Sequence, residues 1–280
     1  MHIVDSQVHL WAAESPDRPW PPGRAPEAQK PYPIVKETML FQMDLAKVSR
    51  VVIVPPSWEG DRNDLALEAA RSYPDRFAVM GQFPLDDPES RKRIHGWRNQ
   101  PGMMGLRWAL LYPEQQKDLH EGKLDWVWPA AEKEGIPVAT MAGLFLPTFK
   151  KIAEAHPRLK LIIDHCGLLR LEKDAAAFGN LDALCALAKL PNVAVKATGA
   201  PGYSTHPYPF RNLHDGLQRI FDAYGPDRFF WGTDITRMPC TYRQCVTMFT
   251  EELPWLKGQD LEKVMGRGLA KWIGWNYKFD

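Results

Sequence analysis

The chain alternates short β-branched and apolar runs with longer segments of helical periodicity, and the alternation repeats eight times. This order is typical of parallel strands joined by helices. The predicted strands are residues 2–10, 50–54, 76–83, 104–109, 136–141, 160–165, 192–198 and 228–234. The predicted helices are residues 33–47, 61–73, 88–97, 125–134, 146–155, 174–189, 211–224 and 242–253. No glycine-rich turn follows the first strand, so the pattern favours a (β/α)8 TIM barrel over an open doubly wound sheet.

A barrel of this kind commonly forms one domain at this length, and we expect residues 1–280 to be a single domain. Residues 260–275 follow the eighth unit and predict an extra helix packed under or beside the barrel. Two proline-rich segments, 11–33 after the first strand and 200–210 after the seventh, are typical of lids or binding loops. His206, in the second segment, is a further candidate functional residue.

Composition argues against several classes of function. The net charge of +1 gives no electrostatic basis for binding nucleic acid or an anionic membrane. No segment approaches the about 18 apolar residues of a membrane span, and the start of the chain lacks the features of a signal peptide. Cys166, Cys185, Cys240 and Cys245 lack metal-binding or dense disulfide spacing, which favours reduced thiols in a cytoplasmic protein. We interpret Cys240 and Cys245 as packed or surface thiols rather than ligands.

The first predicted strand is typical of a metal site with one ligand exchanged. Side chains alternate along a strand, so Asp5, Gln7 and His9 are expected to share a face. A His-x-His pair would place two imidazoles beside one metal, but Gln7 stands where the first histidine would be. A metal enzyme, a metal-free enzyme and a barrel that has lost its activity all remain open at this point.

Barrel chemistry takes place at the C-terminal ends of the strands. The residues at or just beyond the predicted strand ends are Gln7, His9, Trp58, Gln82, Arg107, Trp108, Thr140, Met141, Asp164, His165, Lys196, Thr198 and Asp234. This set contains carboxylates, histidines and cations, which is the mixture expected of an active site.

Five of these segments, in this order, resemble the amidohydrolase superfamily and, within it, the amidohydrolase-2 group. That group includes sugar-lactone and pyrone-dicarboxylate lactonases and aromatic-acid decarboxylases. The matching segments are Val-Asp-Ser-Gln-Val-His-Leu-Trp at 4–11, Gly-Leu-Arg at 105–107, Ile-Asp-His-Cys-Gly at 163–167, Asn-Val-Ala-Val-Lys at 192–196 and Phe-Trp-Gly-Thr-Asp at 230–234. Residues 265–274 are similar to the family's final helix. The chain departs from the family pattern at Gln7 and in the fifth strand, which offers no metal ligand.

The resemblance implies that Asp234 is a general base acting on the attacking water. His165 would be a proton shuttle or electrophilic donor, and His9 and Arg107 would help to stabilise the oxyanion. The structural alternatives are that Asp234 caps the next helix and that the histidines are hydrogen-bonded core groups. If a single divalent metal, zinc or manganese, were bound, its ligands would be His9, His165 and Asp234. We expect no tightly bound metal, because the lactonase branch includes members that work without one.

Three cations, Arg107, Lys196 and Arg237, lie at or just past strand ends and favour an anionic substrate. The alternative is that each pairs with a buried acid such as Asp5 or Asp164. Trp11 and Trp58 are candidates for an apolar wall of the pocket. The predicted substrate contacts are Gln7, Lys196, Arg237, Trp108 and Tyr203.

The sequence therefore predicts a hydrolase, specifically a lactonase that opens a cyclic ester of an anionic or polyhydroxylated small molecule. The alternatives are a metal-dependent decarboxylase of an aromatic or dienoic acid and a non-catalytic ligand-binding barrel. The sequence leaves the oligomeric state open, a homo-oligomer included.

Overall fold

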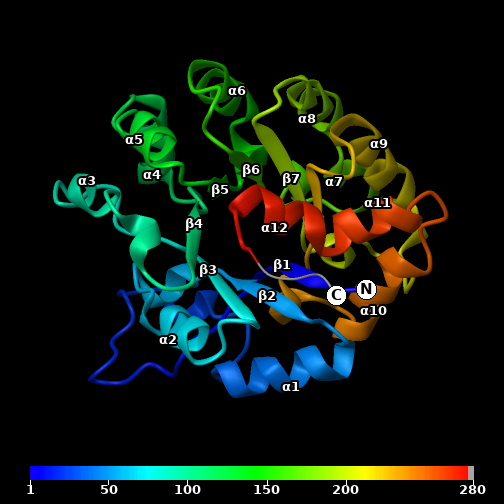
Figure 1. Ribbon diagram of the computed structural model, residues 1–280, viewed down its shortest axis with the longest axis horizontal. Helices are drawn as coiled ribbons and strands as arrows, with labels where there is room; N and C mark the ends of the chain where they lie inside the picture. The colour runs from blue at the N-terminus through cyan, green and yellow to red at the C-terminus, as the bar shows by residue number, and fades with distance from the viewer. Residues whose placement is uncertain (277–280) are drawn as a thin grey trace.

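The computed structural model describes residues 1–276 and contains one sheet of eight parallel strands, ordered as they occur along the chain. The strands are β1 Val4–Val8, β2 Arg50–Ile53, β3 Phe77–Gly81, β4 Met103–Trp108, β5 Val138–Thr140, β6 Leu161–Ile163, β7 Val193–Ala197 and β8 Phe229–Trp231. The predicted (β/α)8 barrel is confirmed, and Figure 1 shows its helices surrounding the strands. The predicted domain limit falls on residues 277–280, which lie outside the described residues.

The helices follow the predicted alternation with three differences. They are α1 Lys36–Ala46, α2 Asp64–Ser72, α3 Ser90–Arg93, α4 Pro113–His120, α5 Val127–Glu134, α6 Leu146–Ala155, α7 Asp174–Ala177, α8 Leu181–Ala186, α9 His214–Tyr224, α10 Tyr242–Thr250, α11 Gly258–Glu262 and α12 Gly268–Ile273. Helix α4 was not predicted, because its polar sequence lacks an apolar stripe. The predicted helix 174–189 is divided between α7 and α8, and 88–97 forms only the short α3.

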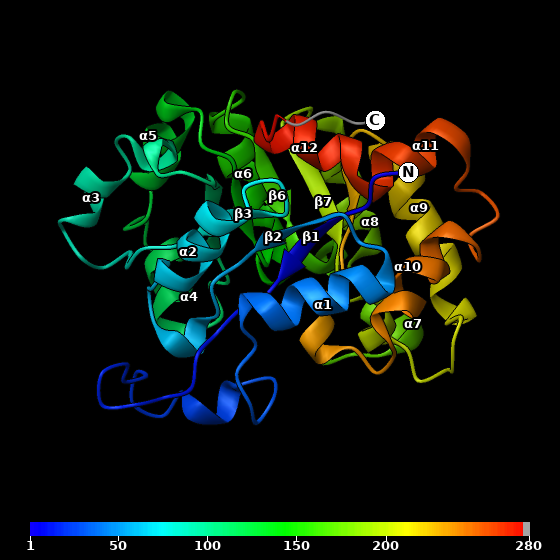
Figure 2. The same cartoon turned by 60° about the horizontal axis from the view of Figure 1, so that its bottom comes forward.

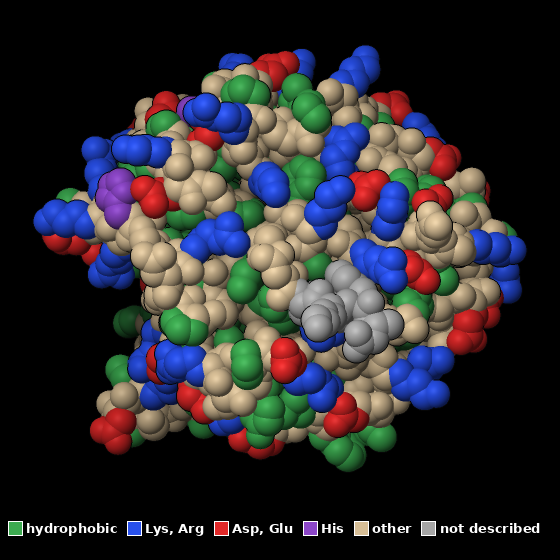
Figure 3. Space-filling model, in the orientation of Figure 1, with side chains coloured by type: hydrophobic (Ala, Val, Ile, Leu, Met, Phe, Trp, Pro, Cys, Tyr) green, Lys and Arg blue, Asp and Glu red, His purple; other side chains and the backbone are tan. Residues whose placement is uncertain are grey.

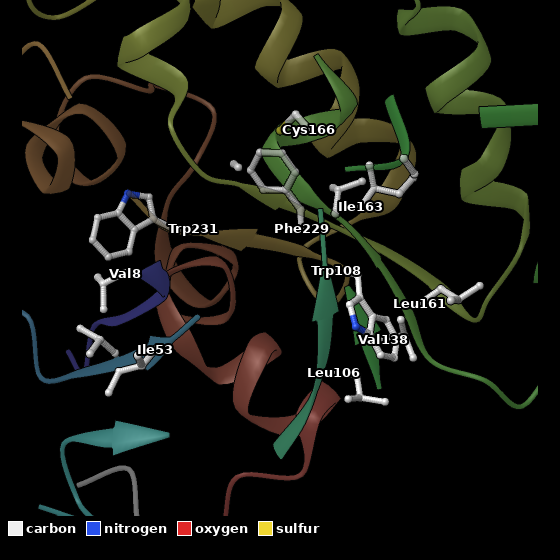
Figure 4. Packing of buried hydrophobic residues seen from close by; sticks show 14 of the residues in the cluster. Val8, Ile53, Leu106, Trp108, Val138, Leu161, Ile163, Cys166, Phe229 and Trp231 are labelled. Atoms are coloured by element: carbon white, nitrogen blue, oxygen red, sulfur yellow. The ribbon is translucent and has the colours of Figure 1, made fainter. Parts of the chain in front are cut away.

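The barrel interior is filled by side chains, as in other barrels of this size. Its buried members on the strands, or directly after one in the case of Val54, are Val4, Val52, Val54, Ala78, Met80, Ala139, Ile162, Ala194 and Phe230. A second, larger apolar layer lies between the strands and the outer helices. Figure 4 shows part of this layer, with Val8 of β1 close to Ile53 of β2.

The end of the barrel opposite the loop after β1 is closed by α12 (Figure 2). The interior cluster includes Leu269 and Ile273 of α12 and Trp275 just after it, so this segment fills that end of the barrel. Gly266 permits the approach, because a Cβ there would lie 2.8 Å from the Val4 Cγ2 atom. The predicted segment 260–275 thus packs under the barrel, although it is divided into α11, a π-helical turn and α12.

The prediction that Asp5, Gln7 and His9 share one face of β1 is wrong for Asp5. The pairing of β1 with β2 shifts by one residue between Asp5 and Val8, which is a β-bulge. Accordingly, Val4 belongs to the barrel interior whereas Val8 packs in the outer layer. The bulge leaves Gln7 free to contact β7, while Asp5 contacts the turn after β8 and α10.

The Asp5 carboxylate joins the first strand to the last. It accepts hydrogen bonds from the backbone N–H of Thr233 (2.9 Å), the Thr233 hydroxyl, the Tyr242 hydroxyl (2.8 Å) and the backbone N–H of Gln7 (3.0 Å). The Asp234 N–H also donates to the Gln7 carbonyl at 2.9 Å. Burial raises the pKa of Asp5 to about 6, although its hydrogen bonds oppose this rise. The contribution of Asp5 to stability is therefore greatest at acidic pH and declines as the pH rises through about 6.

Basic and acidic side chains are interspersed over the face drawn in Figure 3, in keeping with the net charge of +1. Among the helices formed by residues 1–276, none has both the length and the apolar character needed to cross a membrane.

We predict that Tyr242→Phe lowers the free energy of unfolding by about 1.5–3 kcal/mol at pH 8, where Asp5 is ionised. The substitution removes one donor from a buried carboxylate, which must then remain incompletely hydrogen-bonded. Urea unfolding followed by circular dichroism measures the change.

Tyr208→Phe is the matched control, because the Tyr208 hydroxyl donates to a neutral group, the Thr247 hydroxyl, at the same 2.8 Å. Its expected cost is smaller, about 0.5–1.5 kcal/mol. Equal effects of the two substitutions would contradict a special role for the Asp5 contact.

Candidate active site

Seven of the thirteen predicted strand-end residues border two adjoining cavities at the C-terminal ends of the strands. The larger has a volume of about 480 Å³ and the smaller about 200 Å³. Both are lined by Met141, His165, Arg170, Asp234 and Arg237. Gln7, His9, Trp58 and Arg107 complete the strand-end part of the larger cavity. A third cavity of about 230 Å³, which shares Ser57, Ala109 and Tyr112 with the larger one, is lined by Trp108 but by neither His165 nor Asp234.

Asp234 follows β8 and is paired with His9 from β1. The residue adopts a left-handed backbone conformation (φ 52°), which is uncommon outside glycine and is typical of functional sites. His9 Nε2 lies 3.1 Å from Asp234 Oδ1, and His9 Nδ1 lies 2.6 Å from the Val54 carbonyl. The carbonyl only accepts, so Nδ1 carries a proton, and a hydrogen bond to Asp234 requires a second proton on Nε2.

Asp234 is 1% exposed, so burial opposes its ionisation. The attraction of His9, and then of His165 and Arg237, outweighs burial and holds the pKa of the carboxyl well below its usual range. Asp234 is therefore ionised in the free protein.

His165 lies at the turn after β6 and is fixed by Thr198 of the neighbouring strand end. The Thr198 hydroxyl is 2.9 Å from His165 Nδ1 and 3.2 Å from the His165 backbone N–H. Burial lowers the pKa of His165 to about 4, although Asp234 and Asp164 act in the opposite direction. The imidazole is thus neutral near pH 7.

A second buried network lies beneath the cavity. Lys196 Nζ is 2.7 Å from Asp164 Oδ1 and donates to Gln7 Oε1 at 2.8 Å, and Arg107 Nε donates to Asp164 Oδ2 at 2.8 Å. Burial opposes the ionisation of Asp164, but Lys196, Arg107 and His165 together keep the pKa of its carboxyl well below the usual range. Lys196 has only donors, so it fixes the Gln7 amide with oxygen toward the ammonium, and among residues 1–276 Gln7 Nε2 has no hydrogen-bond partner.

Several predicted substrate contacts lie elsewhere. Lys196 is fully buried and outside the lining of both active-site cavities, so the alternative reading, pairing with Asp164, describes its contacts. Trp108 borders only the third cavity and donates to the Phe83 carbonyl. Trp11 packs edge-on against Trp58, with ring centroids 5.3 Å apart. Tyr203 lines the smaller cavity, as expected of a contact residue.

The two proline-rich loops contribute unequally. Pro26, Glu27 and Gln29 of the first loop line the larger cavity, and Tyr112 donates to Glu27 at 2.7 Å. From the second loop, Gly202 and Tyr203 line the smaller cavity. His206 is exposed and borders neither active-site cavity.

Arg170 was missed by the sequence analysis, although it lines both cavities. It lies several residues beyond the end of β6, in a segment without a recognisable motif, so its position depends on the path of the loop. Arg170 and Arg237 are both exposed, and within residues 1–276 neither side chain forms an ion pair or hydrogen bond, although the Arg237 backbone N–H donates to the Asp234 carbonyl at 3.0 Å.

The residues that would hold a metal do not form a suitable ligand set. Within the described part of the chain, no three His, Cys, Asp or Glu side chains are grouped as metal ligands would be. The Gln7 oxygen already accepts from Lys196, and Asp164 is bound by two cations. This donor set does not fit a tightly held divalent ion.

Comparison with known proteins supplies a family and a fold. The amidohydrolase family model matches residues 4–275. An L-fucono-1,5-lactonase of Burkholderia ambifaria is 26% identical over 248 residues, which cover 82% of this chain and 79% of that enzyme.

Two solved structures are similar over nearly the whole chain. An amidohydrolase from Burkholderia multivorans, crystallised with bound zinc, has a TM-score of 0.80 at 20% identity and covers 98% of this chain and 99% of its own. A protein from Acinetobacter baumannii, described as a probable 2-pyrone-4,6-dicarboxylic acid hydrolase with citric acid bound, has a TM-score of 0.70 at 18% identity and covers 98% and 100%. At these identities the likeness establishes the shared fold.

We predict that Lys196→Met lowers the free energy of unfolding by about 3 kcal/mol, because Asp164 would keep a buried charge with Arg107 as its remaining close cation. Chemical denaturation measures the loss. Lys263→Met is the control: Lys263 pairs with Asp227 at 2.9 Å at the surface, so this substitution should cost much less stability. A Lys196→Met variant as stable as this control would contradict the proposed charge balance.

Proposed function

The chain belongs to the amidohydrolase family, and from this premise we propose that it is a lactonase that opens a cyclic ester by hydrolysis. The observation that carries the proposal is the buried Asp234 carboxylate, paired with His9 and bordering the 480 Å³ cavity beside His165 and Arg107. The cavity has room for a small cyclic substrate and one attacking water.

Asp234 is proposed as the general base. In the free site its basicity is suppressed by His9, His165 and Arg237. When water attacks the lactone carbonyl, the developing oxyanion draws on the same neighbours, by attraction to Arg237 and by accepting a hydrogen bond from the neutral His165. Asp234 then becomes a better proton acceptor as charge moves onto the substrate oxygen.

His165 and Arg107 are proposed to stabilise the oxyanion, with His9 completing the positive side of the site. If the Thr198 hydroxyl at 2.9 Å donates to His165 Nδ1, rather than an Nδ1–H donating to the Thr198 carbonyl at 3.2 Å, the ring proton lies on Nε2. A neutral imidazole in that tautomer is an electrophilic donor that keeps its proton near pH 7. Arg107 is held by Asp164 through Nε, and its terminal nitrogens remain for the substrate.

The tetrahedral intermediate collapses by expelling the ring oxygen, which takes the proton from Asp234. This step regenerates the carboxylate and releases the open-chain hydroxy acid. Gln7, which lines the cavity and has an unsatisfied Nε2 donor, is proposed as a further contact to substrate.

The substrate class is proposed from the charges around the cavities. Within the described residues the side chains of Arg170 and Arg237 form no hydrogen bond or ion pair, and they suit a carboxylate or a ring of hydroxyl groups. The Burkholderia ambifaria relative is named for a sugar lactone, which fits the polyhydroxylated alternative. We therefore propose a lactone of a sugar acid or of a related carboxylate-bearing compound.

We predict that Asp234→Asn lowers kcat/KM by about 10²–10⁴-fold, because the amide cannot accept the proton of the attacking water. Hydrolysis of a panel of five- and six-membered sugar-acid and dicarboxylate lactones, followed by proton release, identifies a substrate and measures the loss.

Asp182→Asn is the control for that substitution, because the Asp182 side chain is 92% exposed and far from the cavities in the fold. Circular dichroism of both variants tests for intact folding. Near-normal turnover by a folded Asp234→Asn variant would exclude the mechanism.

We predict that lactonase activity survives chelation unchanged, since the ligand set does not fit a tightly bound metal. Elemental analysis before and after dialysis against a chelator, with activity measured in parallel, makes the test. Stoichiometric zinc or manganese whose removal abolishes activity would contradict this prediction and would favour the decarboxylase alternative.

A further inference from the structure

A pair of thiols lies at the start of α10, outside the cavities described above. Cys240 Sγ is 3.5 Å from Cys245 Sγ. Both thiols are free in the structure. Their neighbourhood contains Tyr242, which donates to Asp5, and Trp231, whose Nε1 donates to the Cys245 carbonyl.

The local helix geometry holds the two sulfurs together. Thr241 caps α10, its hydroxyl accepts from the Gln244 N–H at 3.2 Å, and Gln244 Oε1 accepts from the Thr241 N–H at 3.0 Å. In such a capping box, the residue before the cap packs against the fourth residue of the helix. These positions usually carry apolar side chains, but here they are Cys240 and Cys245.

The two thiols differ in their exposure to solvent. Cys240 is half-buried and lines a cavity of about 360 Å³ formed by residues of α1, α10 and the segment after β8. Cys245 is 2% exposed and has Cys240 as its sulfur neighbour. Hydrogen bonding from Cys245 lowers the pKa of Cys240, although partial burial opposes this effect.

We propose that Cys240 and Cys245 form a reactive dithiol, with Cys240 as the attacking thiol and Cys245 as the resolving thiol, that a small-molecule disulfide converts to an intramolecular disulfide. The Cys240 thiolate attacks one sulfur of the reagent disulfide, which releases one thiolate and forms a mixed disulfide. Cys245 then attacks Cys240 Sγ and expels the second reagent thiolate, which takes the Cys245 proton. The protein thus loses two protons and two electrons, and the reagent disulfide is reduced to two thiols.

The bond would fix the end of a functional segment. Residues 232–241 connect β8 to α10 and include Asp234 and Arg237. A Cys240–Cys245 bond ties this segment covalently to the first turns of α10. This inference does not rest on the lactonase proposal.

The test is incubation of the folded protein with oxidised glutathione, followed by thiol counting and peptide mass spectrometry. We expect free thiols to fall from four to two, with no retained glutathione and a single cross-link between Cys240 and Cys245. In Cys245→Ser, the reaction should stop at a glutathione adduct on Cys240. In Cys240→Ser, the buried Cys245 should remain unmodified.

Cys185→Ser is the control, because Cys185 is half-buried but its sulfur contacts the Arg219 carbonyl at 3.8 Å rather than another thiol. This variant should form the cross-link as readily as the wild type. The proposal is overturned if the wild type keeps four thiols, retains a stable adduct on Cys240, or forms its cross-link between other cysteines.

Discussion

The arrangement of the site depends on the buried carboxylate of Asp5. It gathers donors from β1, from the turn after β8 and from α10, at the seam where the first and last strands meet. Together with the Asp234–Gln7 backbone hydrogen bond, it sets the position of β8 relative to β1. The pairing of His9 with Asp234 crosses the same seam, so the geometry of the reactive pair follows from the closure of the barrel.

Positive and negative groups in the site are balanced in two layers. In the lower layer, Asp164 is held between Lys196 and Arg107, and the whole set is withdrawn from solvent. In the upper layer, Asp234 faces His9 with His165 and Arg237 nearby. Arg107 belongs to both, since it binds Asp164 and also lines the cavity. The lower layer thereby anchors a cation where an anionic transition state would form.

Periodicity was sufficient to predict the barrel, because each strand–helix unit shows its apolar pattern locally. It was also sufficient to place His9, Arg107, His165 and Asp234 at the same end, since strand ends converge in any barrel. The side on which Asp5 lies could not be predicted, because a single extra residue in β1 reverses the alternation.

The contacts of a buried charged side chain also could not be predicted from the local sequence. Whether Lys196 contacts substrate or Asp164 depends on how far two neighbouring strands bring their side chains together. Arg170 illustrates a different limit, because a loop residue acquires its place only from the path of the loop.

The closure of one barrel end by α12 has a consequence for how the protein folds during synthesis. The interior opposite the site is sealed by Leu269, Ile273 and Trp275, which contact a layer that begins at Val4. During synthesis on the ribosome, the first strand is produced long before these side chains emerge. The barrel floor therefore stays open to water until almost the whole described chain is available, and contacts between such distant segments are characteristic of slow folding. During that interval, the apolar strands of the nascent barrel are protected from water only by molecules that bind them.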